Sequence, residues 1–154
     1  MKWVWDDGGR AAAGFRGLAG DCVCRAIAIA SGQDYRVVYN AINKYAQGGY
    51  PLRRRGLRSS ARTGVAKPVY RRYLSDLGWE WVPTMFVGQG CRVHLRTGEL
   101  PGGRLVVNCS RHLTAVIDGV VHDIFDPSRD GTRCVYGFWQ AQSATRQEPG
   151  CDRW

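Results

Sequence analysis

Three residues far apart in the chain are of the types that together catalyse acyl transfer: Cys22, His112 and Asp123. The thiol of a cysteine can attack a carbonyl carbon, and a histidine can accept and return the proton. A carboxylate beside the imidazole holds that ring in the required tautomer. The chemistry needs a fold that brings an early cysteine to a histidine and an acid from a much later segment.

Cys22 is expected in the first turn of a short buried helix over 21–30. Asp21 is a residue type that caps helices, the apolar residues of GDCVCRAIAIASG recur at helical spacing, and a Ser-Gly pair ends the pattern. The backbone N–H groups of a helix start stabilise a thiolate and can hold an oxyanion. Cys24 lies in the same turn but points about 200° away around the helix. It is therefore the reserve nucleophile.

The segment RHLTAVIDGVVHD predicts a β-hairpin that turns at Asp118-Gly119. Side chains alternate along each strand, which makes His112 and Asp123 diagonal neighbours on one face of the hairpin. Asp126 falls on the opposite face in this register. It is the reserve acid, because a bulge would shift the register by one residue.

This arrangement resembles that of papain-like cysteine hydrolases, in which a cysteine opens a buried helix and a histidine and an acid follow on later strands. GDCVCRAIAIASG and SRHLTAVIDGVVHD also look like segments of small proteins of bacteria and their phages. The resemblance covers 21–30 and 104–126. It implies a papain-like fold in which Cys22 is the nucleophile, His112 the general base and Asp123 the orienting acid.

Many papain-like enzymes carry a glutamine shortly before the cysteine as an oxyanion donor. Arg16 stands at that position in this chain, so Arg16 and Asn108 are the candidate donors. The activity that the resemblance implies is cleavage of a peptide, isopeptide or amide bond, or transfer of the acyl group. A protease, a deconjugating enzyme, an amidase and a transferase all fit these residues, and none of them needs a cofactor.

The hydrophobic pattern predicts helices in the first half of the chain and strands in the second. Helices are expected over 34–46 and 67–78 with a helical turn near 91–96, strands over 79–85, 103–109 and 133–139, and a hairpin over 113–126. This order predicts an α+β fold with N-terminal helices packed on an antiparallel sheet of four to five strands. The 154 residues are expected to form a single domain over 1–154, with an extended arm over 1–20 and a flexible tail over 141–154.

The net charge of +9 comes from one segment, 44–72, which holds nine basic and no acidic residues. Such a segment can bind the phosphates of nucleic acid or an acidic protein surface. The predicted partner-binding residues are Arg53, Arg54, Arg55, Arg58 and Arg62. The expected partners are a polypeptide or conjugate substrate of acidic character and, through 44–72, nucleic acid.

A different class of protein also fits the sequence, namely a basic nucleic-acid- or protein-binding module that is catalytically inactive or stabilised by zinc. Cys22, Cys24, Cys109 and His112 could supply four zinc ligands. However, Cys22 and Cys24 diverge on one helix, unlike the Cys-x-x-Cys knuckles of most zinc sites. The main interpretation therefore includes no metal.

The N-terminal stretch MKWVWDDGGR lacks the apolar run of a secretion signal, and nowhere are about 18 apolar residues consecutive. We therefore expect a cytoplasmic protein without a membrane segment. In that compartment all six cysteines are expected to be reduced.

Overall fold

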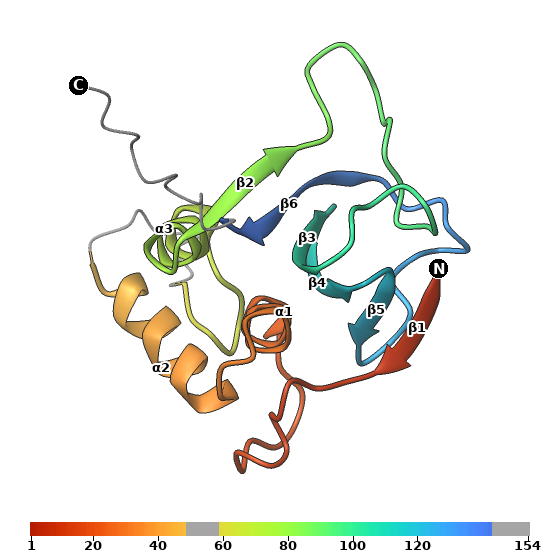
Figure 1. Ribbon diagram of the computed structural model, residues 1–154. Coiled ribbons are helices and arrows are strands. Elements are labelled where there is room, and N and C mark those ends of the chain that lie inside the picture. Colours follow the sequence, from red (N-terminus) through yellow and green to blue (C-terminus); the bar gives the residue numbers. More distant parts are fainter. Residues whose placement is uncertain (49–58, 143–154) are drawn as a thin grey trace, which may run out of the picture.

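The structure is a computed structural model that describes residues 1–48 and 59–142. Its elements follow in the order β1 (Lys2–Trp5), α1 (Cys22–Ser31), α2 (Tyr35–Ala46), α3 (Lys67–Asp76), β2 (Trp79–Pro83), β3 (Arg104–Cys109), β4 (His112–Ile117), β5 (Val120–Asp123) and β6 (Val135–Ala141). The helices form one layer and the sheet another (Figure 1). The predicted α+β class is confirmed. The predicted tail lies outside the described residues from position 143 onward.

In the described part of the chain, six strands form one sheet in the order β1-β5-β4-β3-β6-β2. β1 runs parallel to β5, and the other neighbouring strands are antiparallel. The prediction of an antiparallel sheet of four to five strands is therefore wrong in strand number and in direction. Residues 2–5 of the predicted arm form the extra strand at the sheet edge. Parallel pairing between such distant segments leaves no local signal in the sequence.

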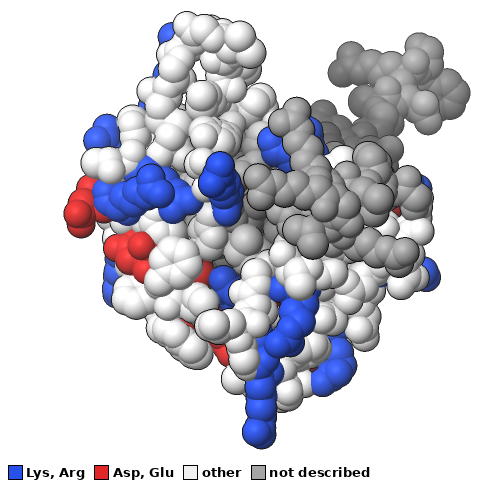
Figure 2. Space-filling view, turned by 180° about the vertical axis from the view of Figure 1, so that it is seen from behind, with Lys and Arg blue, Asp and Glu red and all other residues white. Residues whose placement is uncertain are grey.

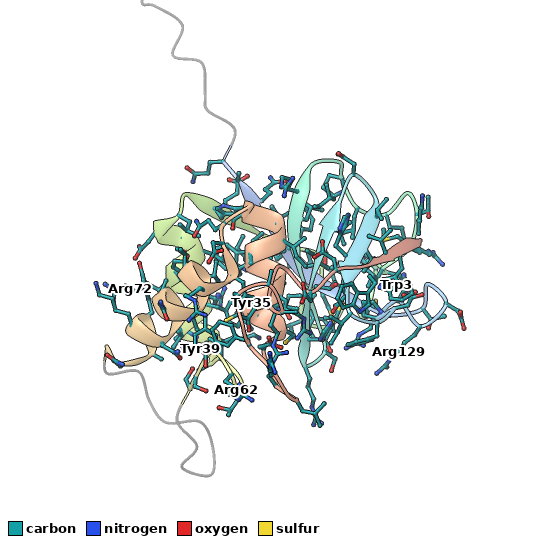
Figure 3. All side chains as sticks on the ribbon, turned by 90° about the horizontal axis from the view of Figure 1, so that it is seen from below. Trp3, Tyr35, Tyr39, Arg62, Arg72 and Arg129 are labelled. Atoms are coloured by element: carbon teal, nitrogen blue, oxygen red, sulfur yellow. A yellow bond between two sulfur atoms is a disulfide. The ribbon has the colours of Figure 1, made fainter. Side chains whose placement is uncertain are left out.

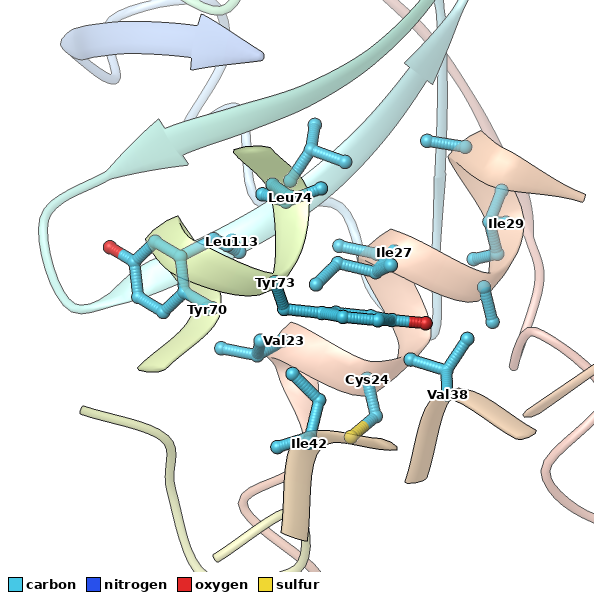
Figure 4. Close-up of a cluster of buried hydrophobic side chains, with 14 of the residues drawn as sticks. Val23, Cys24, Ile27, Ile29, Val38, Ile42, Tyr70, Tyr73, Leu74 and Leu113 are labelled. Atoms are coloured by element: carbon cyan, nitrogen blue, oxygen red, sulfur yellow. The ribbon is translucent and has the colours of Figure 1, made fainter. Parts of the chain in front are cut away.

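α1 is the central helix of the fold, which confirms the helix predicted over 21–30. Positions 23–30 are all buried, because α1 packs on β3 and β4 with one side and against α2 with another. Val23 and Ile27 belong to a hydrophobic cluster that also contains Ile42 of α2 and Leu74 of α3 (Figure 4). Because this cluster surrounds the helix, the first turn of α1 has a fixed position relative to the sheet.

Asp21 occupies the N-cap position of α1, as predicted, but its side chain does not cap the helix. Its buried carboxylate instead accepts a hydrogen bond from the hydroxyl of Tyr35 at 2.5 Å and another from the guanidinium of Arg25. Arg10 forms an ion pair with the same carboxylate, with Nε 3.0 Å from Oδ2. Asp34, in contrast, caps α2 with its side chain. The first-turn N–H groups of α1 therefore have no side-chain cap.

β4 and β5 form the predicted hairpin. Asp118 and Gly119 have φ values of 45° and 77°, the left-handed backbone of the tight turn that an Asp-Gly pair predicts. The register between the strands is the expected one. His112 at the start of β4 and Asp123 at the end of β5 therefore share one face of the sheet.

The connection between β2 and β3, residues 84–103, covers the face of the sheet opposite the helices (Figure 1). Leu95 of this connection is fully buried in a second hydrophobic cluster on that face. A disulfide bond between Cys91 and Cys134 ties the connection to the residue before β6. The predictions of a helical turn near 91–96 and of six reduced thiols are therefore wrong, because this segment is held by sheet contacts and by the disulfide rather than by helical hydrogen bonds.

Gly137 in β6 lies directly beneath the ring of Trp81 in β2. A Cβ at position 137 would collide with that ring and with the carbonyl oxygen of Val82. Gly137→Ala is therefore expected to lower the free energy of unfolding by about 2 kcal/mol, the usual cost of forcing an atom into a packed site. A Cβ at Gly102 lies 3.6 Å from its nearest neighbour, so Gly102→Ala is the matched control, with an expected change within about 0.5 kcal/mol. Urea unfolding measures both, and equal stabilities would contradict this packing.

Candidate active site

Cys22, the first residue of α1, lies at the wall of a cleft of about 620 Å³. The cleft runs between the start of α1, the segment 63–67 at the start of α3, and the turn from β3 to β4. Cys22 is partly exposed there. Cys24 is fully buried on the side of α1 that faces α2, with its sulfur 3.7 Å from the carbonyl oxygen of Ala61 (Figure 4). The reserve nucleophile is therefore not at the cleft.

His112 and Asp123 form a buried hydrogen-bonded pair. Nε2 of His112 lies 2.7 Å from Oδ2 of Asp123, and Oδ1 of Asp123 accepts a hydrogen bond from the backbone N–H of Ile124 at 2.8 Å. The ring of Phe125 packs on the imidazole with 5.1 Å between centroids. These contacts fix the orientation of the imidazole ring and leave Nδ1 for another partner.

The thiol of Cys22 interacts with the imidazole of His112, and this interaction lowers the pKa of the thiol and raises that of the imidazole. The fold thus brings the three predicted residues together in the order sulfur, imidazole, carboxylate. α1 supplies the first of them, and the two ends of the β4–β5 hairpin supply the others.

The electrostatics of this group favour a charged sulfur. Burial alone raises the pKa of Cys22, but hydrogen bonds from His112 and the backbone of Leu113, with the charges of His112 and Arg25, bring the pKa below its ordinary value. Burial alone lowers the pKa of His112, but hydrogen bonds to Asp123 and Cys22 raise it to about 9. The pKa of Asp123 is lowered because, although burial opposes ionisation, the imidazolium stabilises the carboxylate. Both shifts favour the ion pair of a thiolate and an imidazolium over the neutral thiol and imidazole.

The other predicted site residues lie apart from this group, with one exception. The carboxylate of Asp126, the reserve acid, accepts the backbone N–H of Ser128 at 2.9 Å and starts a turn. Arg16 is exposed on the loop after β1, where its carbonyl oxygen accepts a hydrogen bond from Arg62 at 3.1 Å. It does not line the cleft. Asn108 is buried and lines the cleft, so it is the one oxyanion candidate of the two that reaches the site.

Sequence reasoning missed a buried arginine behind the site. Arg25 is 5 % exposed. Its guanidinium donates to the carboxylate of Asp21 and lies 3.6 Å from Oδ1 of Asp123. Arg25 therefore connects the start of α1 to the acid of the hairpin. The signal available was its i,i+4 spacing from Asp21 on a helix whose other residues are nearly all apolar.

The predicted partner surface is described only in part. Arg53, Arg54, Arg55 and Arg58 lie outside the described residues. Arg62 is exposed at the edge of the helix layer (Figure 3). Blue Lys and Arg side chains outnumber red carboxylates on the face in Figure 2.

In the part of the chain that the structure describes, no helix is long and apolar enough to cross a membrane.

The zinc alternative lacks its ligand set. Over positions 1–48 and 59–142, no three His, Cys, Asp or Glu side chains are grouped so that they could hold a metal ion. Cys24 packs between α1 and α2, while the pKa of Cys109 is raised by burial to about 11. Neither sulfur joins Cys22 and His112 at a common point.

Comparison of the chain with protein-family models, with curated proteins and with solved structures gives no match.

The lowered pKa of Cys22 can be tested by chemical labelling. Iodoacetamide is expected to alkylate Cys22 rapidly at pH 7, because its pKa is lowered, whereas Cys109 stays unlabelled in the folded protein. In His112→Ala the hydrogen bond and the positive charge are lost, so the pKa of Cys22 rises. Its labelling rate at pH 7 is then expected to fall by about tenfold or more. Peptide mapping by mass spectrometry measures the rate at each cysteine.

His122 offers the matched control. It pairs with Asp6, with Nδ1 3.1 Å from Oδ2, and lines no part of the cleft. His122→Ala is expected to leave the labelling of Cys22 unchanged. An equal rate at Cys22 in His112→Ala and in the unmodified protein would mean that the imidazole does not activate the thiol.

Proposed function

We propose that the protein is a papain-like cysteine hydrolase or acyltransferase that acts on a peptide, isopeptide or amide bond. The observation that supports this proposal is the chain of sulfur, imidazole and carboxylate at the wall of an open cleft. Two other cysteines of the protein provide a comparison for Cys22. Burial raises the pKa of both Cys24 and Cys109, as is usual for structural thiols. Of the three free cysteines in the described residues, only Cys22 has neighbouring groups that overcome the effect of burial on its pKa. Such a perturbed pKa beside a cleft is typical of a nucleophile.

Acylation of Cys22 uses all three residues. Sγ attacks the carbonyl carbon, an S–C bond forms, and the carbonyl electron pair moves onto oxygen. As the electron pair returns, the C–N bond breaks and His112 gives its Nδ1 proton to the leaving nitrogen. Asp123 keeps the ring in place through Nε2 and stabilises its positive charge beforehand. The product of this step is a thioester on Cys22 and a free amine.

Deacylation reverses the proton transfer. A water molecule forms a bond to the thioester carbon and gives a proton to the neutral imidazole, after which the S–C bond breaks and the thiolate returns beside the imidazolium. An amine or alcohol in place of water gives acyl transfer instead. The residues set the chemistry, and the acceptor that reaches the cleft decides between hydrolysis and transfer.

The oxyanion is stabilised by backbone and side-chain donors beside Cys22. The side chain of Asp21 is turned to Tyr35 and Arg25, so the first-turn N–H groups of α1 keep no side-chain cap beside Cys22. These N–H groups and the positive end of the helix dipole suit a developing negative charge. The amide of Asn108 on the opposite wall is the side-chain donor in this proposal.

A polypeptide or a conjugate is the proposed substrate, because the cleft measures about 620 Å³ and polar side chains such as those of Lys67, Asn108 and Arg111 line it. The reaction as written needs no cofactor. A cytoplasmic location stays a prediction.

An acyl-enzyme burst tests the function. With p-nitrophenyl acetate, the protein is expected to release one p-nitrophenolate rapidly per molecule as Cys22 is acetylated. Cys22→Ala is expected to lose this burst, and Asp123→Asn to slow it by about a hundredfold or more, because the ring loses its orienting charge. Stopped-flow absorbance measures the burst, and mass spectrometry locates the acetyl group.

Two controls sharpen this test. His122→Ala removes a histidine that is also paired with an aspartate but lies away from the cleft, so it should keep the full burst. Circular dichroism checks that each variant is folded. An undiminished burst in Cys22→Ala, or acetyl groups spread over several residues, would exclude Cys22 as the nucleophile.

A further inference from the structure

A smaller cavity of about 60 Å³ adjoins the cleft. The two share Lys67, Tyr70 and Asn108 in their walls, so this side pocket opens beside the proposed site of acyl transfer. Its inner wall is formed by the aromatic rings of Trp81 and Trp139, whose centroids lie 5.5 Å apart. A group that extends from a substrate bound at Cys22 can therefore enter it.

One residue that lines the side pocket carries a hydrogen-bond donor that the described part of the chain does not satisfy. Trp139 is 3 % exposed, and its Nε1–H, which can only donate, has no acceptor. Asn108, 6 % exposed, presents an amide that also interacts with the hydroxyl of Tyr70. A buried donor without a partner costs about 1–3 kcal/mol. The pocket therefore favours a ligand that brings an acceptor.

The charges around the pocket are of one sign. Lys67 and Arg71, one turn apart on α3, both line it, and neither forms an ion pair with any residue in the described ranges. Arg71 places its guanidinium 5.7 Å from the centre of the Trp81 ring, which holds it beside the pocket. Among the residues that the structure describes, no aspartate or glutamate lines either the pocket or the cleft. An acceptor that enters is therefore favoured if it carries negative charge.

The small volume and the aromatic walls of the pocket favour a small, flat anion. A volume of 60 Å³ corresponds to about two water molecules. That is room for a carboxylate and little of the chain that carries it. A carboxylate is also flat, as are the ring walls, and it accepts hydrogen bonds from guanidinium, ammonium, amide and indole donors alike.

We propose that this side pocket binds a carboxylate of the substrate, so that the site acts on acyl compounds with an acidic group close to the bond that is cleaved. The inference rests on the proposed function, since it places the pocket beside the reacting thiolate. The carboxylate belongs either to an aspartate or glutamate side chain or to a chain terminus. The chemistry of recognition is the same for both, and the experiment separates them.

Chloroacetyl peptides that alkylate Cys22 test the proposal in the intact protein. One pair compares chloroacetyl-Glu-amide with chloroacetyl-Gln-amide and reports on a side-chain carboxylate. A second pair compares chloroacetyl-Gln as free acid and as amide and reports on a terminal carboxylate. The acidic member of at least one pair is expected to react with Cys22 about tenfold faster, as a charge-assisted hydrogen bond allows.

Variants connect this preference to the pocket. Arg71→Gln and the uncharged change Trp139→Phe are each expected to reduce the acid preference to about threefold or less, while the rate with the neutral reagent stays the same. Lys2→Gln removes an exposed cation from β1 at the opposite edge of the sheet, and it should keep the full preference. Because Arg71 is exposed, its variant stays informative even if Trp139→Phe does not fold.

The outcomes separate the two hypotheses. Rapid alkylation of Cys22 by neutral reagents with no preference for acid in either pair overturns the carboxylate pocket and leaves the proposed function intact. A preference that survives in Arg71→Gln and in Trp139→Phe overturns it as well. If no reagent modifies Cys22 faster than the other cysteines, the proposed function fails, and the inference fails with it.

Discussion

The site depends on one buried guanidinium. Arg25 lies between two carboxylates that would otherwise repel each other, donating to Asp21 and lying 3.6 Å from Asp123. Asp21 precedes α1 and Asp123 ends β5, so this side chain joins the helix that carries the sulfur to the strand that carries the acid. Removing one partner of a buried ion pair leaves an uncompensated charge. This contact adds to the apolar packing that positions α1 against the sheet.

The charges of the buried group balance when the sulfur is ionised. Asp21, Asp123 and the Cys22 thiolate are the anions, and Arg10, Arg25 and the His112 imidazolium are the cations. If the thiol kept its proton and the imidazole its charge, the group would hold one excess positive charge in a poorly solvated place. A neutral thiol with a neutral imidazole is balanced as well, and it is the hydrogen bonds of His112 with Asp123 and Cys22 that favour the ion pair. This explains how burial, which alone disfavours both charged forms, is overcome at Cys22 and His112.

The sequence predicts well what local rules control. The Asp118-Gly119 turn determines the hairpin register, and the register puts His112 beside Asp123; the apolar spacing after Asp21 places Cys22 in a first helical turn. Long-range contacts leave no such trace. The parallel pairing of β1, the disulfide of Cys91 and the direction of the Asp21 side chain all depend on segments that meet only in the folded chain. A capping residue type signals a helix start, but it does not signal that a buried arginine and a tyrosine will compete for its carboxylate.

The hydrogen bonds of Asp21 to Arg25 and Tyr35 affect both the stability of α1 and the chemistry at its first turn. A capped α1 would be more stable by about 1 kcal/mol, but its cap would occupy the N–H groups next to the thiolate. Here the carboxylate of Asp21 stabilises the fold through Arg25 and Tyr35 instead, so the start of α1 stays open toward the cleft. Asp34, in contrast, caps α2 in the ordinary way. The Asp at the N-cap of α1 therefore does not cap its helix, at a place where an open helix end can act on a substrate. Such exceptions to local rules are expected at the functional sites of proteins.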